Sequence, residues 1–468
     1  MTLRQACLTL TVLALVPLIA PAHAGERVPA TADAQPTAPY FSSIDTLEAQ
    51  MQGGHASAVT ITQSFIRRIH ELDRNGPKVN AVIELNPEAL AIARRRDDAR
   101  RNGQAHGVLF GIPVMVKDNI DTADRMQTTA GSLAMLGPPP ARDATVVAKL
   151  RAAGAVLLGK TNLSEWANFR STHSSSGWSA RGGLTRNPYV LSRSACGSSS
   201  GSAAAVAAGF VTVALGTETD GSVICPSATN GIVGIKPTLG LVSRAGIVPI
   251  SHSQDTAGAM ARTVTDAAIL LTAIAGSDPR DPATADADRH ATDYTRFLTP
   301  DALRGRRIGV VRELAGYDPN VDRILDQSVA ALRAAGAIVV DPVQLPHVRD
   351  YEKDEMTVLL YEFKHDLNAY LATRPGLKVR TLADLIAFDR REAATEMPWF
   401  GQDLFVKAQA KGELTDPAYL KALAREKRLS GPQGIDAALA EHHLDALMAP
   451  ATGPAWTIDL VNGDHFTG

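Results

Sequence analysis

Residues 196–238 read CGSSSGSAAAVAAGFVTVALGTETDGSVICPSATNGIVGIKPT, a run of small residues with apolar segments inside it. Within it, SAAAVAAGF predicts a helix, while VTVALGT and IVGIKPT predict buried strands. The serines and glycines ahead of the helix raise the question of which hydroxyl, if any, does chemistry. Serine caps and tight packing of a helix against a sheet explain the same residues. Gly197 to Gly201 alone therefore do not decide between structure and catalysis.

The alternation of strands and helices continues on both sides of this stretch. Upstream, residues 111–119, 143–154 and 155–162 read as strand, helix and strand. Downstream, a capped helix is predicted at 263–275, and 306–343 forms a second strand, helix, strand unit. This alternation predicts an α/β protein, a single large α/β/α layered domain around a central mixed, largely parallel sheet.

Three helices are predicted between this core and the N-terminus, each from a capping pattern ahead of an apolar stripe. The capping residues are Asp45 with Glu48, Thr60 with Gln63, and Asn86 with Pro87. The Asp- and Pro-rich segment 277–300 is interpreted as a surface excursion within one domain.

The first 24 residues have the form of a cleaved secretory signal. Arg4 precedes an apolar run at 8–20, and PAHA ends at Ala24. A run of about 13 apolar residues falls short of the roughly 20 that span a bilayer. We therefore expect signal peptide 1–24, a flexible lead-in at 25–40 and a folded domain at 41–468. The mature protein is expected to be periplasmic or secreted, with no membrane association.

Composition excludes some functions and leaves the state of two cysteines open. The chain of 468 residues has a formal net charge of −2 and 5% aromatic residues, which argues against nucleic acid as a partner. Removal of the signal also removes Cys7 and leaves Cys196 and Cys225. The sequence is compatible either with one disulfide bridge between these two cysteines or with two free thiols. Neither cysteine has a partner at metal-ligand spacing, so no metal is expected.

One hypothesis makes Ser199 a nucleophile. Gly197, Ser199 and Gly201 fit the G-x-S-x-G turn of α/β-hydrolases, which also needs an acid and a histidine downstream. The downstream histidines stand in no motif that would select one: His347, His365, His442, His443 and His465.

The wider stretch, together with GIPVMVKDN and GKTNLSEWANF, resembles the amidase signature family from about Phe41 onward. Ser198 and Ser222 stand at the family's separation of 24 residues, and Lys117 matches its lysine. The resemblance implies amide hydrolysis through an acyl-enzyme, without metal or cofactor. It implies Ser222 as nucleophile, Ser198 as proton shuttle after a cis peptide bond, and Lys117 as base.

A lysine base must be neutral, whereas an ordinary lysine is only about 0.1% neutral near pH 7.4. Burial would lower its pKa, and the apolar FGIPVM ahead of Lys117 suits that. Lys160 and Lys236 have similarly apolar approaches, so only the resemblance selects Lys117 among the three.

The remaining site residues belong to two loops. The oxyanion of the tetrahedral intermediate is expected at the backbone amides of Thr219, Asp220, Gly221 and Ser222. The Asp220 side chain is expected to hold this loop, and Ser199 to hydrogen-bond the site or the helix N-terminus. Gly197, which has no side chain, is the sterically least demanding residue that can precede the cis bond.

Departures from the family pattern bear on the substrate. Cys196 and Ser200 are small replacements in the signature, while Ile224 stands where the family has an arginine. With GWSARGG at 177–183, the chain looks most like the peptide amidase branch, which implies C-terminal amides of peptides as substrates. The chain stops at GDHFTG where family members run on, so its C-terminal end is expected to be truncated.

Other functions are weighed against this interpretation. A general amidase for small amides is the close alternative. A glutamine-hydrolysing amidotransferase subunit is opposed by the signal sequence, and a non-catalytic binding protein by the intact set of two serines and a lysine. A monomer acting on a small-molecule or peptide amide is expected.

Overall fold

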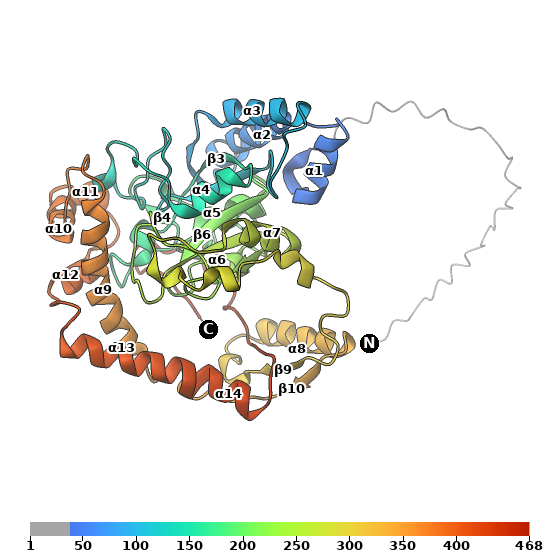
Figure 1. Cartoon of the computed structure of the whole chain (residues 1–468). Coiled ribbons are helices and arrows are strands. Elements are labelled where there is room, and N and C mark those ends of the chain that lie inside the picture. Colours follow the sequence, from blue (N-terminus) through green and yellow to red (C-terminus); the bar gives the residue numbers. More distant parts are fainter. Residues whose placement is uncertain (1–37, 468) are drawn as a thin grey trace, which may run out of the picture. The chain divides into compact units, whose positions relative to one another are not determined.

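A computed structural model describes residues 38–467 of the chain, beginning with a short 3₁₀ turn at Pro39–Phe41 (Figure 1). The predicted signal peptide, and the lead-in up to residue 37, lie outside the described residues. None of the helices within 38–467 is long and apolar enough to cross a bilayer.

A six-stranded mixed sheet forms the centre of the fold, as the sequence predicts. Its strands lie in the order β1-β3-β2-β6-β8-β7. Their bounds are β1 Val82–Leu85, β2 Pro113–Lys117, β3 Val156–Thr161, β6 Val213–Glu218, β7 Val233–Ile235 and β8 Thr256–Ala261. Every residue of β2, β3, β6 and β8 is buried, which explains their near-continuous apolar sequences.

The sheet is mixed, as predicted, but not largely parallel, because its parallel pairs are confined to the centre. β2 pairs in parallel with β3 and with β6, and the outer pairs are antiparallel. Parallel strands need crossover connections, and both pairs have a helix in theirs. These helices are α4 (Thr145–Ala152) and α5 (Ser200–Ala207). The carboxyl ends of β2 and β6 therefore lie side by side.

Four further helices pack around this sheet: α1 (Ile44–Gln52), α2 (Ala58–Arg68), α3 (Ala89–Arg101) and α7 (Val264–Ile274). The predicted caps of the first three are wrong by a few residues. Ser43 and Ser57 cap α1 and α2, because their extended backbones aim the hydroxyls at the N–H groups of the first turn. Asn86 instead accepts from the N–H of Glu88, and α3 begins after it.

The predicted strand, helix, strand unit at 306–343 does form, but in a separate sheet. β9 (Arg307–Val310), α8 (Pro319–Ala334) and β10 (Ile338–Val340) are its parts. β9 pairs in parallel with β10 and with β11 (Ala446–Met448). The local pattern of such a unit specifies its strands but not the sheet that they join.

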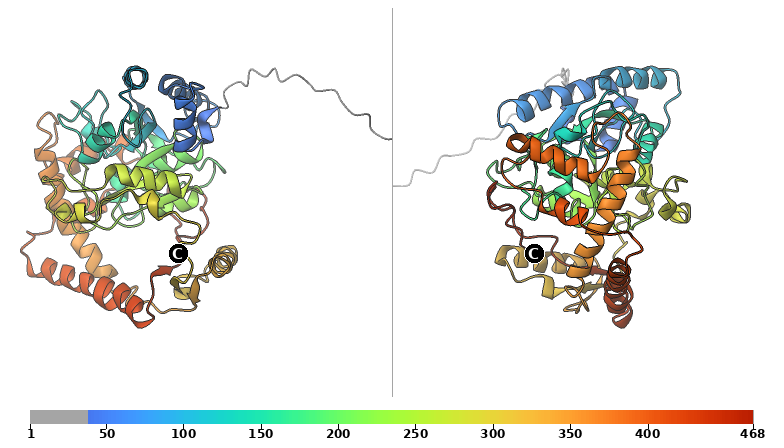
Figure 2. Two further views of the ribbon diagram at one scale, coloured as in Figure 1. Left: turned by 45° about the vertical axis from the view of Figure 1, so that its right-hand side comes forward. Right: turned by 90° about the vertical axis from the view of Figure 1, so that its left-hand side faces the viewer.

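A helical layer follows in sequence, which local patterns had not predicted. It comprises α9 (Glu352–Ala372), α10 (Leu382–Arg391), α11 (Ala393–Glu396), α12 (Asp403–Gln409), α13 (Pro417–Ser430) and α14 (Asp436–Glu441). A second hydrophobic cluster around Phe363, Phe405 and Trp166 joins α9 to α12 with the loop after β3. Helices α9 and α13 pack along each other (Figure 2).

Candidate active site

Lys117 ends β2 with its ammonium group inside the protein. Its Nζ lies 2.7 Å from Ser198 Oγ, 2.9 Å from Thr217 Oγ1 and 3.3 Å from Thr217 O. Thr217 lies near the end of β6, the parallel neighbour of β2, so the sheet register brings the two residues together. The side chain of Lys117 is fully buried. The sequence-predicted lysine and shuttle serine are thus in direct contact.

Burial lowers the pKa of Lys117 from 10.5 to about 7, although the negative charges of Asp255 and Glu218 oppose the shift. About half of the lysine is then neutral near pH 7, compared with roughly 0.1% for an ordinary lysine. The surrounding groups satisfy both protonation states. An ammonium donates to all three oxygens, whereas the neutral amine donates to Thr217 and accepts from the Ser198 hydroxyl.

The other two lysines that the sequence left open have different surroundings. Lys160 is buried, but its Nζ donates to Ile120 O at 2.5 Å and to Thr128 Oγ1 at 2.9 Å. Lys236 is exposed and donates to Pro237 O. Neither of these lysines hydrogen-bonds Ser198 or Ser222, so the geometry favours Lys117.

Ser198 follows a cis peptide bond from Gly197, as the resemblance implied. A side chain at Gly197 would collide with the Ser164 hydroxyl and press on those of Ser176 and Ser200. Only glycine fits at this position. Because it has no side chain, the backbone of the signature segment can lie close to Ser164, Ser176 and Ser200. The Ser198 carbonyl accepts from Ser164 N at 3.1 Å.

Ser199 is bound to the backbone of β6. Its hydroxyl donates to Thr217 O at 3.1 Å and accepts from Thr217 N at 3.2 Å. No histidine among the described residues hydrogen-bonds it. The arrangement that a Ser199 nucleophile needs is therefore not assembled here.

Ser222 lies in the loop between β6 and α6 (Ile224–Thr229), with 7% of its surface exposed. Its carbonyl accepts from Ser199 N at 3.1 Å, which fixes the loop beside the residue that follows Ser198. Within 38–467 the Ser222 hydroxyl forms no hydrogen bond, to Ser198 or to any other residue. It is free to meet a substrate.

The four amides expected to bind an oxyanion are unengaged. Among the described residues, none of the N–H groups of 219–222 donates a hydrogen bond within the protein. Gly221 has φ +74°, and a side chain there would meet nothing within 4 Å. Consecutive unpaired N–H groups in a turn that contains glycine can donate hydrogen bonds to the negative charge that develops on an oxyanion.

The expectation that the Asp220 side chain holds this loop is wrong. Asp220 is exposed and its carboxylate hydrogen-bonds no described residue. Glu218 takes that role, since its Oε2 accepts from the N–H groups of Val223 at 2.6 Å and Ile224 at 2.9 Å. Thr219 Oγ1 also donates to Asp255 Oδ1 at 2.5 Å.

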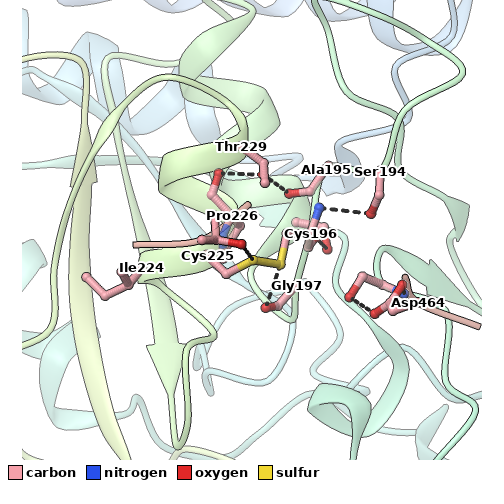
Figure 3. Close-up of a disulfide and its surroundings, with 12 residues drawn as sticks. Ser194, Ala195, Cys196, Gly197, Ile224, Cys225, Pro226, Thr229 and Asp464 are labelled. Carbon is pink, nitrogen blue, oxygen red and sulfur yellow. Dashed lines mark hydrogen bonds between the residues drawn. A yellow bond between two sulfur atoms is a disulfide. The ribbon is translucent and has the colours of Figure 1, made fainter. Parts of the chain in front are cut away.

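A disulfide bridge joins Cys196 to Cys225, with Cα atoms 6.0 Å apart (Figure 3). This answers the question that the sequence left open. The bridge ties a residue two positions before Ser198 to a residue three positions after Ser222. It packs against Trp456 from the C-terminal part of the chain.

A cavity of about 640 Å³ lies beside this cluster, although Lys117, Ser198 and Ser222 are not among its lining residues. Its walls include Asn119, Thr217 and Thr219 near Lys117. The rest of the wall combines the apolar loop at 245–250 with charged side chains such as Arg244, Arg374 and Asp366. Asn119 Nδ2 donates to Thr217 Oγ1 at 2.9 Å, while its Oδ1 has no partner among the described residues. The cavity offers space for a bound molecule beside the loop of Ser222.

One group of potential metal ligands occurs within the described residues, and two of its members, His252 and Asp366, line the same cavity. Atoms of His252, Glu362 and Asp366 lie within 4.8 Å of one another. They already hydrogen-bond each other and their neighbours: His252 Nδ1 lies 2.9 Å from Asp366, and Tyr419 donates to Glu362 at 2.7 Å. The donor set is thus a hydrogen-bonded network apart from Lys117 and Ser198.

Comparison with known proteins gives consistent matches. The family described as Amidase matches residues 60–463. A native peptide amidase from Stenotrophomonas maltophilia is 56% identical, covering 89% of this chain and 85% of that one, with a TM-score of 0.87. A peptide amidase in complex with the competitive inhibitor chymostatin is 55% identical over 91% and 87% of the two chains, with a TM-score of 0.89. A probable amidase of Arabidopsis thaliana is 42% identical over 87% of this chain and 79% of its own.

Proposed function

This chain belongs to the amidase family, and from that premise we propose that it hydrolyses the C-terminal carboxamide of peptides to the free acid and ammonia. The observation that carries the proposal is the buried contact of 2.7 Å between Lys117 Nζ and Ser198 Oγ, beside a lysine whose pKa falls to about 7. A base that is half neutral near pH 7 can accept a serine proton without a histidine.

The proposed reaction has two halves. In the first, neutral Lys117 takes the Ser198 proton as Ser198 takes that of Ser222, and Ser222 Oγ bonds to the carbonyl carbon. The oxyanion then receives hydrogen bonds from the free amides of 219–222. The proton returns through Ser198 to the departing nitrogen. Ammonia then dissociates, and the acyl group remains bound to Ser222 as an ester. In the second, water follows the same route and releases the acid.

Two further observations support a peptide substrate. The two solved relatives at 55–56% identity are peptide amidases. Ile224 occupies the first turn after Ser222 and carries no charge, so no arginine stands there to select a carboxylate-bearing small substrate.

Ammonia release from a panel of amides tests this proposal. Di- and tripeptide amides should give a higher kcat/KM than acetamide or free glutamine, because residues upstream of the amide add binding energy that orients the carbonyl. Internal peptide bonds should stay intact, and Ser222→Ala provides the blank. Equal rates for a dipeptide amide and a simple aliphatic amide would replace this proposal with a general amidase.

We also propose that the protein is exported. The apolar run before PAHA at 21–24 supports this, and so does the bridge between the two cysteines that remain after cleavage, since disulfides persist in oxidising compartments. N-terminal sequencing of protein from the native host should find Gly25 outside the cytoplasm. Recovery of Met1 or Thr2 in a cytosolic pool would contradict it.

A further inference from the structure

Three carboxylates that the proposed reaction does not use lie beside the loop of Ser222. Asp220 belongs to that loop, Glu355 to the first turn of α9 and Glu426 to α13, and α9 packs along α13. A short series of hydrogen bonds links the loop to α9. Thr219 donates to Asp255 at 2.5 Å, and the adjacent Gln254 donates from Nε2 to Glu355 Oε1 at 2.9 Å.

None of these three carboxylates forms a salt bridge among the residues described. Of the two basic residues adjacent to Glu426, Arg425 pairs with Asp354 and donates to Asp350 O. Lys427 forms no salt bridge within the described residues, although its charge partly opposes the rise in the pKa of Glu426. Glu355 receives only the neutral amide of Gln254. No salt bridge therefore offsets the charge that these carboxylates carry when ionised.

The burial of Glu426 distinguishes these three carboxylates from an ordinary group of exposed acidic side chains. It is 8% exposed, and its Oε2 has no hydrogen-bond partner in the described chain. Burial, with the charges of Glu355 and Glu362, raises its pKa to about 7. The pKa of Glu355 is raised as well, first by burial and then by the charge of Asp220. A buried, unpaired carboxylate is costly, and a cation would relieve that cost.

A substrate can come close to these groups. Asp220 and the open side of Gly221 immediately precede Ser222. Two residues of chain span at most about 7 Å, so Asp220 lies within reach of the substrate residues next to the carboxamide.

We propose that Asp220, Glu355 and Glu426 form a subsite for a cationic group of the substrate, carried within the first few residues upstream of the carboxamide. The group is an ammonium or guanidinium, supplied by a basic side chain or by the free amino terminus of a short peptide. This inference rests on the proposed hydrolysis of peptide amides.

The test uses acetylated tripeptide amides that differ in one residue upstream of the carboxamide, which is lysine, norleucine or glutamate. The lysine peptide should exceed the norleucine peptide about five- to tenfold in kcat/KM, the effect of one partly desolvated ion pair, and the glutamate peptide should be slowest. A norleucine peptide with a free amino terminus shows whether the terminal ammonium is also bound. High salt should reduce these ratios.

Variants connect the preference to the subsite. Glu355→Gln should bring the lysine to norleucine ratio close to one, whereas Glu441→Gln, the same change on exposed α14, should leave it intact. Asp220→Asn provides the same test should Glu355→Gln fail to fold. Hydrolysis of all the peptides at equal rates would overturn the subsite and leave the peptide amidase function standing. If peptide amides are hydrolysed no faster than acetamide, both the subsite and the peptide amidase function are overturned.

Discussion

Thr217 accepts two hydrogen bonds from the amine of Lys117, at 2.9 Å on its hydroxyl and 3.3 Å on its carbonyl. The same residue accepts from Asn119 and is bound through its backbone to Ser199. One threonine thus positions the base and the residue next to the shuttle serine. It lies in GTETDGS at 216–222, where the resemblance implies roles only for the residues from Thr219 onward.

Thr217→Val should therefore impair proton transfer while the fold persists. The ammonium loses an acceptor, and hydrogen bonds to charged groups contribute about 1.5–3 kcal/mol, so kcat/KM should fall about tenfold or more. The pKa of Lys117 should fall too, because the charged form loses more than the neutral one. A pH profile of kcat/KM measures both effects. Thr217→Ser keeps the hydroxyl and should stay near wild type; a Val variant with an unshifted profile would contradict the positioning role.

The pH dependence of the wild-type enzyme follows from the same lysine. Its pKa is lowered to about 7 by burial, against the opposing charges of Asp255 and Glu218. The neutral amine is the active base, so kcat/KM should be low below this pKa and rise to a plateau above it. Initial rates on a peptide amide from pH 5 to 9 would measure the midpoint. A rate that is still rising steeply at pH 9 would contradict the lowered pKa of Lys117.

The same shift affects stability in a defined direction. Above the folded pKa of about 7 and below the ordinary value of 10.5, the unfolded chain binds more protons at Lys117 than the folded chain. This residue's contribution to the free energy of unfolding therefore rises with pH across that window. The buried lysine opposes folding most strongly below it.

Alanine variants of Ser198, Ser199 and Ser222 should fall into two groups by their residual activity. Ser222→Ala and Ser198→Ala should each lower kcat about 10³-fold or more, as expected for members of one catalytic unit. Ser199→Ala should retain measurable turnover, since its hydroxyl binds only the Thr217 backbone. A serine-directed covalent probe, mapped by mass spectrometry, should label Ser222. Labelling of Ser199 would restore the α/β-hydrolase hypothesis.

The sequence predicts the sheet-forming segments well because buried strands have apolar runs that local patterns detect. It selects Lys117, Ser198 and Ser222 as candidate site residues only through resemblance, since three apolar lysine environments look alike until tertiary contacts separate Lys117 from Lys160. Glu218 and Asp255 were missed. A carboxylate that caps a loop through backbone N–H groups has no sequence spacing that distinguishes it from a solvated one such as Asp220.

The disulfide should stabilise both the fold and the site. Cys196 and Cys225 are 29 residues apart, and closing a loop of about that length removes roughly 3–4 kcal/mol of unfolded-state entropy at 25 °C. The double variant Cys196→Ser, Cys225→Ser should lose stability of this order, measured by urea denaturation. The bridge also ties the Ser198 loop to the start of α6, so the variant should lose kcat at temperatures where it remains folded. Reductant should lower the wild-type midpoint and leave the double variant unchanged. Equal midpoints for wild type and variant without reductant would show that the two thiols are not bridged in solution.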